Sequence, residues 1–206
     1  MPLKRLPLLV ALLALAIAPL AAGPTRAAPE PDPASSLIAS FHNALVDSMK
    51  QGPSLGAKGR YRKLAPVVER TFDLPTMTRF AVGTAWSGFS KGQQQAAIDA
   101  FGRLTIASYA QNFKAYGGER FEIDPNVQTR GPDKIVQSRM IRPHDAPVAL
   151  IYRMRESGGA WKVIDVYYGA ISQLTTRRSD FAAPVASGGA AGLIAHLNAL
   201  VDNLMK

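Results

Sequence analysis

The chain has 206 residues, of which 47% are hydrophobic and 19% are charged, and its formal net charge is +9. Because the sequence contains no cysteine, disulfides are excluded and the fold must depend on a full hydrophobic core. The positive charge favours anionic partners, such as membrane surfaces or phospholipid headgroups.

The N-terminal segment has the order of features typical of a secretory signal peptide. Lys4 and Arg5 precede an apolar run over residues 6–22, and Thr25-Arg26-Ala27 supplies small residues for cleavage. We expect residues 1–27 to be removed, which lowers the net charge from +9 to +6 because three basic residues leave. The other interpretation is an uncleaved anchor, but the run is short for a span of about 20 residues. Export to a bacterial periplasm fits the sequence and argues against a nucleic-acid partner.

The proline-rich residues 28–36 are expected to be a flexible lead-in to a single domain over residues 37–206. Ser35 or Ser36 is expected to cap a first helix, in which apolar residues recur every four positions from Leu37 to Met49. Glycine and proline over residues 51–59 break this pattern. A second helix is expected from about Lys58, with a kink or an earlier start because of Pro66.

A third helix is expected from Leu74-Pro75, where proline suits the first turn, to residues 86–88. Ser90 and Gln93 then form a capping box, the strongest helix-start signal in the chain. The helix that follows should span residues 91–116 and stop at Gly117-Gly118. Its apolar stripe is too wide for a surface helix, which indicates apolar neighbours on more than one side.

Four strands are expected next, over residues 119–123, 134–142, 147–156 and 161–168, with turn residues between them. The third strand places Val148, Leu150, Tyr152 and Met154 on one face. The fourth, by strict alternation, places Ile164, Val166 and Tyr168 on one face and Trp161, Val163, Asp165 and Tyr167 on the other. Helical patterning resumes after Ser172, and Gly188-Gly189 precedes a last helix up to Leu204. The sequence therefore predicts an α+β fold, with an antiparallel sheet of about four strands packed by N- and C-terminal helices.

The sequence offers little for catalysis. His42, His144 and His196 are far apart and show no zinc-binding spacing, and there is neither a nucleophile elbow nor a phosphate-binding glycine loop. We therefore expect no metal and no cofactor. Asp165 is a lone carboxylate in an apolar strand. It is either a general base with a raised pKa or a structural acid that accepts hydrogen bonds.

The ordered series of motifs resembles the MlaC/toluene-tolerance family. The segment Phe72-Asp73-Leu74-Pro75-x-Met77-x-Arg79-Phe80-Ala81-x-Gly83-x-x-Trp86 is similar to the family signature F-x-L-P-x-M-x-R-x-A-L-G-x-x-W. Similarity continues through Gln93, Phe101, Leu104, Tyr109, Tyr116 and Gly118-Glu119. It extends to Tyr152-Arg153, the Trp161-Lys162-Val163-x-Asp165-Val166 run, Gly169-x-x-Ser172, Arg177-x-x-x-Phe181 and Ile194. The resemblance spans nearly all of the chain after the leader.

This resemblance implies a periplasmic phospholipid carrier of the Mla pathway, which takes lipid between the inner and outer membranes with membrane-bound transport complexes as partners. It implies a nuclear-transport-factor-like cone, in which a curved antiparallel sheet and helices surround an apolar pocket for acyl chains. Residues 167–172 and 175–179 depart from the family pattern and resemble the branch linked to hopanoid biosynthesis. A hopanoid-type lipid is therefore the alternative ligand.

The expected pocket lining combines apolar residues of the helices and strands: Phe80, Leu104, Tyr109, Phe113, Val136, Met140, Leu150, Tyr152, Val166 and Tyr168. Five arginines are expected to form a basic rim for headgroups or partners: Arg139, Arg142, Arg153, Arg177 and Arg178. Trp86 and Trp161 are interpreted as core residues. Two other hypotheses remain, an enzyme of the same cone type that uses Asp165 on a lipid, and a non-catalytic adaptor of a membrane lipid-transport complex.

Overall fold

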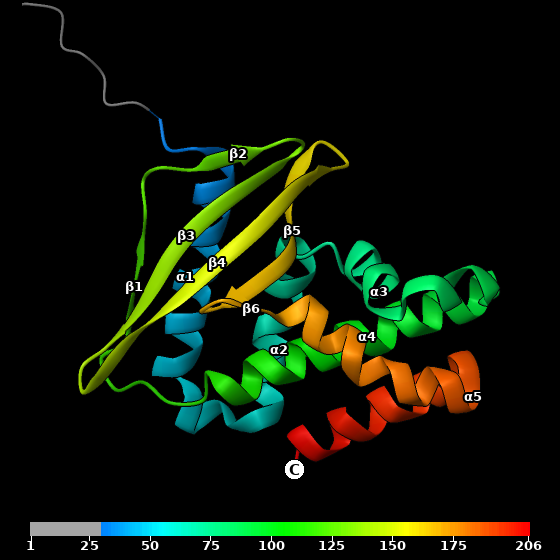
Figure 1. The fold of residues 1–206 in the computed structure, drawn as a ribbon. Helices are drawn as coiled ribbons and strands as arrows, with labels where there is room; N and C mark the ends of the chain where they lie inside the picture. The colour runs from blue at the N-terminus through cyan, green and yellow to red at the C-terminus, as the bar shows by residue number, and fades with distance from the viewer. Residues whose placement is uncertain (1–29) are drawn as a thin grey trace, which may run out of the picture. The chain divides into compact units, whose positions relative to one another are not determined.

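Helices precede and follow a six-stranded antiparallel sheet (Figure 1). The computed structural model describes residues 30–206, and residues 31–206 form one unit. The predicted signal peptide and the start of the predicted lead-in lie outside the described residues. The α+β class predicted from the sequence is confirmed.

The first two helices begin earlier than predicted. Helix α1 (Pro33–Lys50) starts inside the predicted lead-in because the Asp32 carboxylate, and not Ser35 or Ser36, accepts the capping hydrogen bond, from the Ala34 N–H at 2.9 Å. Helix α2 (Gly52–Thr71) is interrupted at Gly56, whose φ of 61° favours glycine. The predicted helix from Lys58 corresponds to the part of α2 that follows this interruption.

Two more helices lead to the sheet. Helix α3 (Leu74–Val82) continues into a short 3-10 helix, η1 (Gly83–Gly88). The predicted capping box is present at the start of α4 (Lys91–Asn112), where Ser90 and Gln93 exchange hydrogen bonds of 3.3 and 2.9 Å. Helix α4 ends at Asn112 and not at Tyr116, because Phe113 leaves helical geometry and its ring stacks on that of Tyr109.

The strands are β1 (Arg120–Ile123), β2 (Gln128–Arg130), β3 (Asp133–Arg142), β4 (Asp145–Ser157), β5 (Ala160–Tyr168) and β6 (Ile171–Ser172). They are ordered β1-β3-β4-β5-β6, and β2 also pairs with β3. Four of them correspond to the four predicted strands. The short β2 and β6 were not predicted, since two or three residues carry too little periodicity to be recognised.

A β-bulge in β5 corrects one predicted face. Arg153 pairs with Asp165, but Met154 pairs with Val163, so that Ile164 is an extra residue. Directly opposite residues of an antiparallel pair point to the same face. Val163 therefore lies on the inner face with Met154 and Val166, and not on the outer face as strict alternation predicts. The same rule places Tyr168 beside Leu150 on the inner face.

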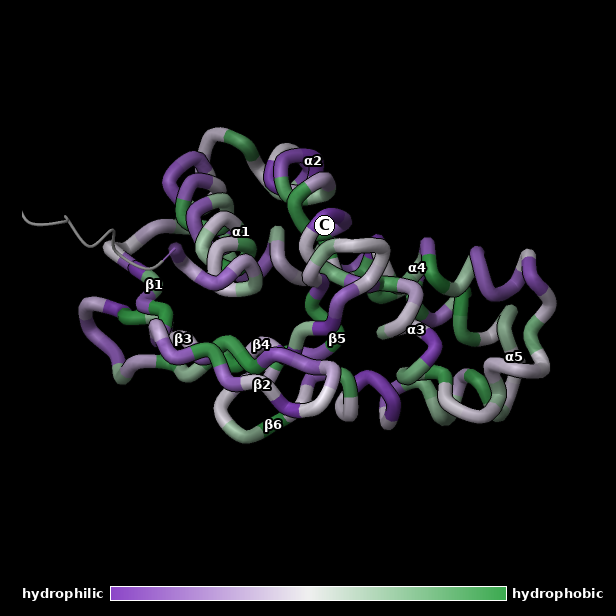
Figure 2. The backbone as a smooth tube through the Cα atoms, turned by 90° about the horizontal axis from the view of Figure 1, so that it is seen from above, coloured by the Kyte–Doolittle hydropathy of each residue, from purple (hydrophilic) through white to green (hydrophobic). Residues whose placement is uncertain are grey.

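The helices lie on one side of the sheet. Figure 2 shows α1 and α2 on one side of the strands and no helix of the described chain on the other. Helices α3, α4 and α5 (Gln173–Leu204) group together beside the sheet (Figure 1). By length and composition alone α5 is apolar enough to span a membrane. It is nevertheless interrupted at Gly189, and its Leu193 and Leu197 side chains are fully buried.

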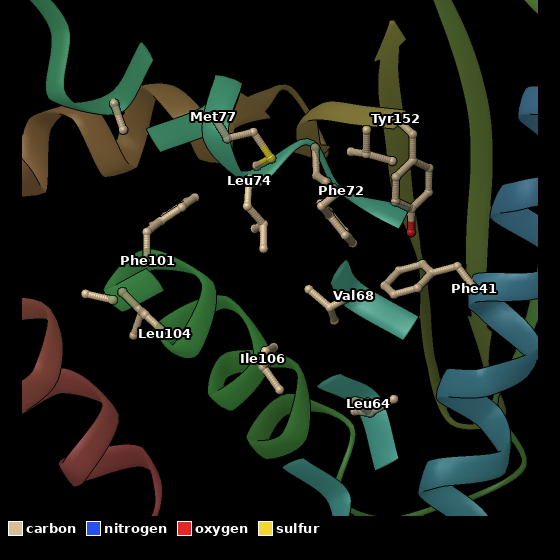
Figure 3. Packing of buried hydrophobic residues seen from close by; sticks show 14 of the residues in the cluster. Phe41, Leu64, Val68, Phe72, Leu74, Met77, Phe101, Leu104, Ile106 and Tyr152 are labelled. Carbon is tan, nitrogen blue, oxygen red and sulfur yellow. The ribbon is translucent and has the colours of Figure 1, made fainter. Parts of the chain in front are cut away.

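The core extends from the group of α3, α4 and α5 to the space between α1, α2 and one end of the inner sheet face. Phe41 of α1 and Tyr152 of β4 point toward each other, with Phe72 close to both (Figure 3). The partly buried Trp86 and Trp161 pack against this core, as predicted. The inner sheet face is thus covered by apolar side chains at one end.

Candidate functional site

A cavity of about 580 Å³ lies at the other end of the inner face, bordered by β3, β4, β5, α4 and the start of α5. Its apolar walls include Phe72, Phe101, Leu104, Met140, Leu150 and Val166. Helix α4 contributes one continuous stripe, because residues three or four apart share a helix face. This stripe comprises Phe101, Leu104, Thr105, Ser108, Tyr109 and Asn112. The volume lies within the range of about 300–1,000 Å³ that is usual for ligand pockets.

One wall of the cavity contains a buried polar pair. The Tyr152 hydroxyl is hydrogen-bonded to Nε2 of His42 at 2.9 Å, and the His42 ring stacks on Phe121 with centroids 4.1 Å apart. Burial lowers the pKa of His42 to about 3 and raises the pKa of Tyr152 well above its ordinary value. Both groups are therefore neutral at neutral pH, and the wall carries no charge.

Polar residues gather where the cavity meets solvent: Asn112, Glu119, Arg142, Gln173 and Arg177. Arg142 donates from Nη2 to the Ala146 carbonyl at 2.9 Å, and its Nη1 lies 3.4 Å from Asp145. The Nε–H of Arg142 is buried and has no hydrogen-bond partner. The two Nη atoms thus hold the Arg142 guanidinium at the rim of the cavity.

An apolar interior with a polar rim suits a molecule that is apolar at one end and polar at the other. Residues 39–199 match the model of the family described as "MlaC protein". The chain belongs to the MlaC family. This family membership was predicted from the ordered motifs.

The MlaC-type fold is also seen in a solved structure. The chain is similar to the phospholipid-binding protein from Ralstonia solanacearum, which was solved in complex with a phospholipid, with a TM-score of 0.74 and 24% identity. The match covers 85% of this chain and 100% of that protein. At this identity the similarity establishes the fold.

In this MlaC-family chain, eight of the ten residues expected to line the pocket border the cavity: Leu104, Tyr109, Phe113, Met140, Leu150, Tyr152, Val166 and Tyr168. The other two do not. Phe80 is 48% exposed on α3, because no element of the described chain covers it. Val136 is on the inner face but is fully buried in the core.

Two of the five arginines expected at the rim, Arg142 and Arg177, border the cavity. Arg139 and Arg153 point to the outer face because of strand alternation, where they pair with Glu122 and Asp133. Arg178 lies against Gly83, so that its guanidinium packs on η1.

Asp165 has a structural position. Its carboxylate accepts hydrogen bonds from the Ser172 hydroxyl at 2.7 Å and the Leu174 N–H at 3.1 Å. These contacts fix the first turn of α5, and Asp165 does not border the cavity. The position matches the interpretation as a structural acid and separates the carboxylate from any bound molecule.

Sequence reasoning missed several lining residues, among them Met49, Thr105, Ser108 and Leu174. Thr105 and Ser108 lie in the same helical stripe as Leu104 and Tyr109, so that helical spacing alone would have identified them. The pairing of His42 with Tyr152 joins residues 110 positions apart and leaves no sequence signal.

Proposed function

We propose that the protein is a phospholipid-binding carrier. The observation that carries this proposal is the apolar cavity, which opens to solvent through a polar rim. Membership of the MlaC family supports it, as does the phospholipid complex of the Ralstonia solanacearum protein, which shares the fold.

In this function the acyl chains occupy the apolar part of the cavity, and the headgroup stays at the rim. Each methylene of an acyl chain that is exposed to water costs about 0.8 kcal/mol. Leu104, Leu150 and Val166 surround the acyl chains with apolar side chains and so exclude water from them. Arg142 and Arg177 place two guanidinium groups at the rim, where they are suited to donate to phosphate oxygens.

The wider setting is part of the same proposal. Residues 1–27 act as a cleaved signal peptide, residues 28–36 as a lead-in and residues 37–206 as the lipid-binding domain in the periplasm. The carrier takes lipid between the inner and outer membranes and docks on membrane lipid-transport complexes. A hopanoid-type lipid is the second candidate ligand, because residues 167–172 and 175–179 depart from the family pattern.

The direct test is native mass spectrometry and lipid extraction of protein purified without detergent. We expect a co-purifying phospholipid, and Leu150→Glu should abolish it because a charge would then line the cavity. Ala149→Glu is the matched control, because Ala149 is exposed on the outer face of the same strand. An empty wild-type protein, or equal lipid content in both variants, would overturn the proposal.

A second variant guards against misfolding of Leu150→Glu. Ser108→Trp fills the cavity without adding charge, since Ser108 borders the open space. We expect a folded protein that carries no lipid, whereas Ser108→Ala should carry as much as the wild type. Retention of lipid in Ser108→Trp would contradict binding in this cavity.

The position of Asp165 argues against the enzyme hypothesis, because both carboxylate oxygens accept hydrogen bonds in the α5 cap. We expect Asp165→Asn to lower stability by about 1–3 kcal/mol and to leave lipid content unchanged. Loss of turnover of a lipid with lipid retained would instead favour the enzyme. The adaptor hypothesis requires a filled interior, and a cavity of about 580 Å³ argues against it.

A further inference from the structure

Exposed apolar side chains concentrate around the cavity opening. Among the described residues, four large hydrophobic side chains are exposed: Phe80, Tyr116, Tyr168 and Ile171. Tyr168 borders the cavity, Ile171 pairs with it across β5 and β6, and Tyr116 follows Ala115, another lining residue. Single exposed apolar residues are ordinary, but three beside one opening indicate a contact surface.

The turn between β5 and β6 holds two of these side chains in place. Tyr168 and Ile171 are direct partners, so both project on the inner face that also bears Leu150. The Gly169 N–H donates to the Ala149 carbonyl at 3.0 Å, which fixes the turn to β4. Tyr168 is 53% exposed and Ile171 is 62% exposed, and Ala170 between them is exposed as well. Residues 168–171, which we name the mouth hairpin, thus present a fixed apolar edge.

The charges of the chain favour an anionic surface. Residues 30–206 have a formal net charge of +6. The whole chain has +9, and three basic residues but no acidic residue precede residue 30. At the cavity, Arg142 and Arg177 lie with Glu119, and each arginine also pairs with an acid, Asp145 and Asp180, so the attraction comes from the excess charge of the whole chain. Lys50 lies 5.1 Å from the centre of the Tyr116 ring.

We propose that the mouth hairpin seats the cavity opening on the surface of an anionic phospholipid bilayer. This inference rests on the proposed function, because it concerns how phospholipid enters and leaves the cavity. Tyrosine beside an aliphatic residue suits the membrane–water interface, and the excess of basic residues is attracted to anionic headgroups. A bilayer is favoured over a protein partner because contact at the opening lets an acyl chain pass directly between bilayer and cavity, without exposure to water.

The first test is co-sedimentation with vesicles of phosphatidylglycerol and phosphatidylcholine. Ile171→Ser removes a side chain that does not border the cavity described above, so lipid content should stay constant. We expect vesicle partitioning to fall by about three- to tenfold, since the bilayer no longer buries an aliphatic side chain at this position. Phe80→Ser is the matched control, because Phe80 is similarly exposed but does not border the cavity, and its partitioning should equal that of the wild type.

The second test reports directly on contact. Because the chain has no cysteine, Ala170→Cys can be labelled at one position with an environment-sensitive fluorophore. Vesicles should shift its emission to the blue, whereas a label at Ser157→Cys, the last residue of β4, should not respond. A silent label at residue 170 would overturn the proposal.

The outcomes separate this inference from the proposed function. If Ile171→Ser binds vesicles as the wild type does, the inference is wrong, even where phospholipid co-purifies. If Ile171→Ser loses only the capture of a membrane protein complex, the surface serves a protein partner and the inference is also wrong. If the wild type carries no lipid but its vesicle binding depends on Ile171, the proposed function fails and the mouth hairpin inference stands.

Discussion

The inner face of β3, β4 and β5 carries similar apolar residues at both ends, yet the two ends differ in what faces them. At the filled end, Val136, Met154 and Val163 are fully buried beneath α1 and α2. At the hollow end, Met140, Leu150 and Tyr168 border a cavity. Val136 and Met140 even lie on the same face of one strand. The difference teaches that the covering helices, and not the strand residues, determine where this protein has space.

The largest expected effect comes from truncating the same residue type at the two ends. Met154→Ala should lower the free energy of unfolding by about 2–5 kcal/mol, because it creates a void in a filled core. Met140→Ala should cost less than about 1 kcal/mol, since its half-buried side chain already borders open space. Urea denaturation measures both. Equal losses would show that the two ends do not differ in packing.

A smaller effect is expected at the border between the ends, where His42 contacts Tyr152. Burial lowers the pKa of His42 to about 3, so folding opposes its protonation. The stability due to neutral His42 is present above pH 6.5 and is lost as the pH falls toward 3. The loss should reach about 2–3 kcal/mol at pH 4.5. His42→Phe should remove this part of the pH dependence, measured by urea denaturation from pH 7 to pH 4. An unchanged pH profile would contradict a buried neutral histidine.

The smallest effect on stability is expected at the rim of the hollow end. Arg177→Gln breaks a largely solvated pair with Asp180 at 3.2 Å and should cost less than about 0.5 kcal/mol. It should nevertheless weaken the retention of phospholipid, measured by native mass spectrometry, because the substitution removes a positive charge that faces the headgroup. Arg139→Gln, on the outer face, is the control and should leave retention unchanged. A stability loss as large as that of Met154→Ala would place Arg177 in the core and not at a rim.

Much of the secondary structure could be predicted, because helix starts, helix breaks and strand faces depend on residues that are close in sequence. The capping box at Ser90, the faces of β4 and the break near Gly188-Gly189 all follow from spacing and backbone preferences. Val163 was assigned to the wrong face, since a bulge adds a residue without changing composition. Phe80 and Val136 resemble Leu104 and Met140 in chemistry. What separates them is coverage by distant elements, which no local pattern encodes.

Ile164, the extra residue of the bulge, lies opposite the junction of Arg153 and Met154, where the filled end gives way to the hollow end. A bulge bends its strand and increases its twist, and Figure 1 shows β5 curving on its way to β6. The position of the empty volume therefore follows the course of the main chain, in the bulged strand and in the covering helices, and not a shortage of bulky side chains. Replacement of a wall residue by one of similar size reshapes such a space without filling it. Conservative point mutations of the wall can thus change which molecule fits, while the cavity itself is retained with the backbone.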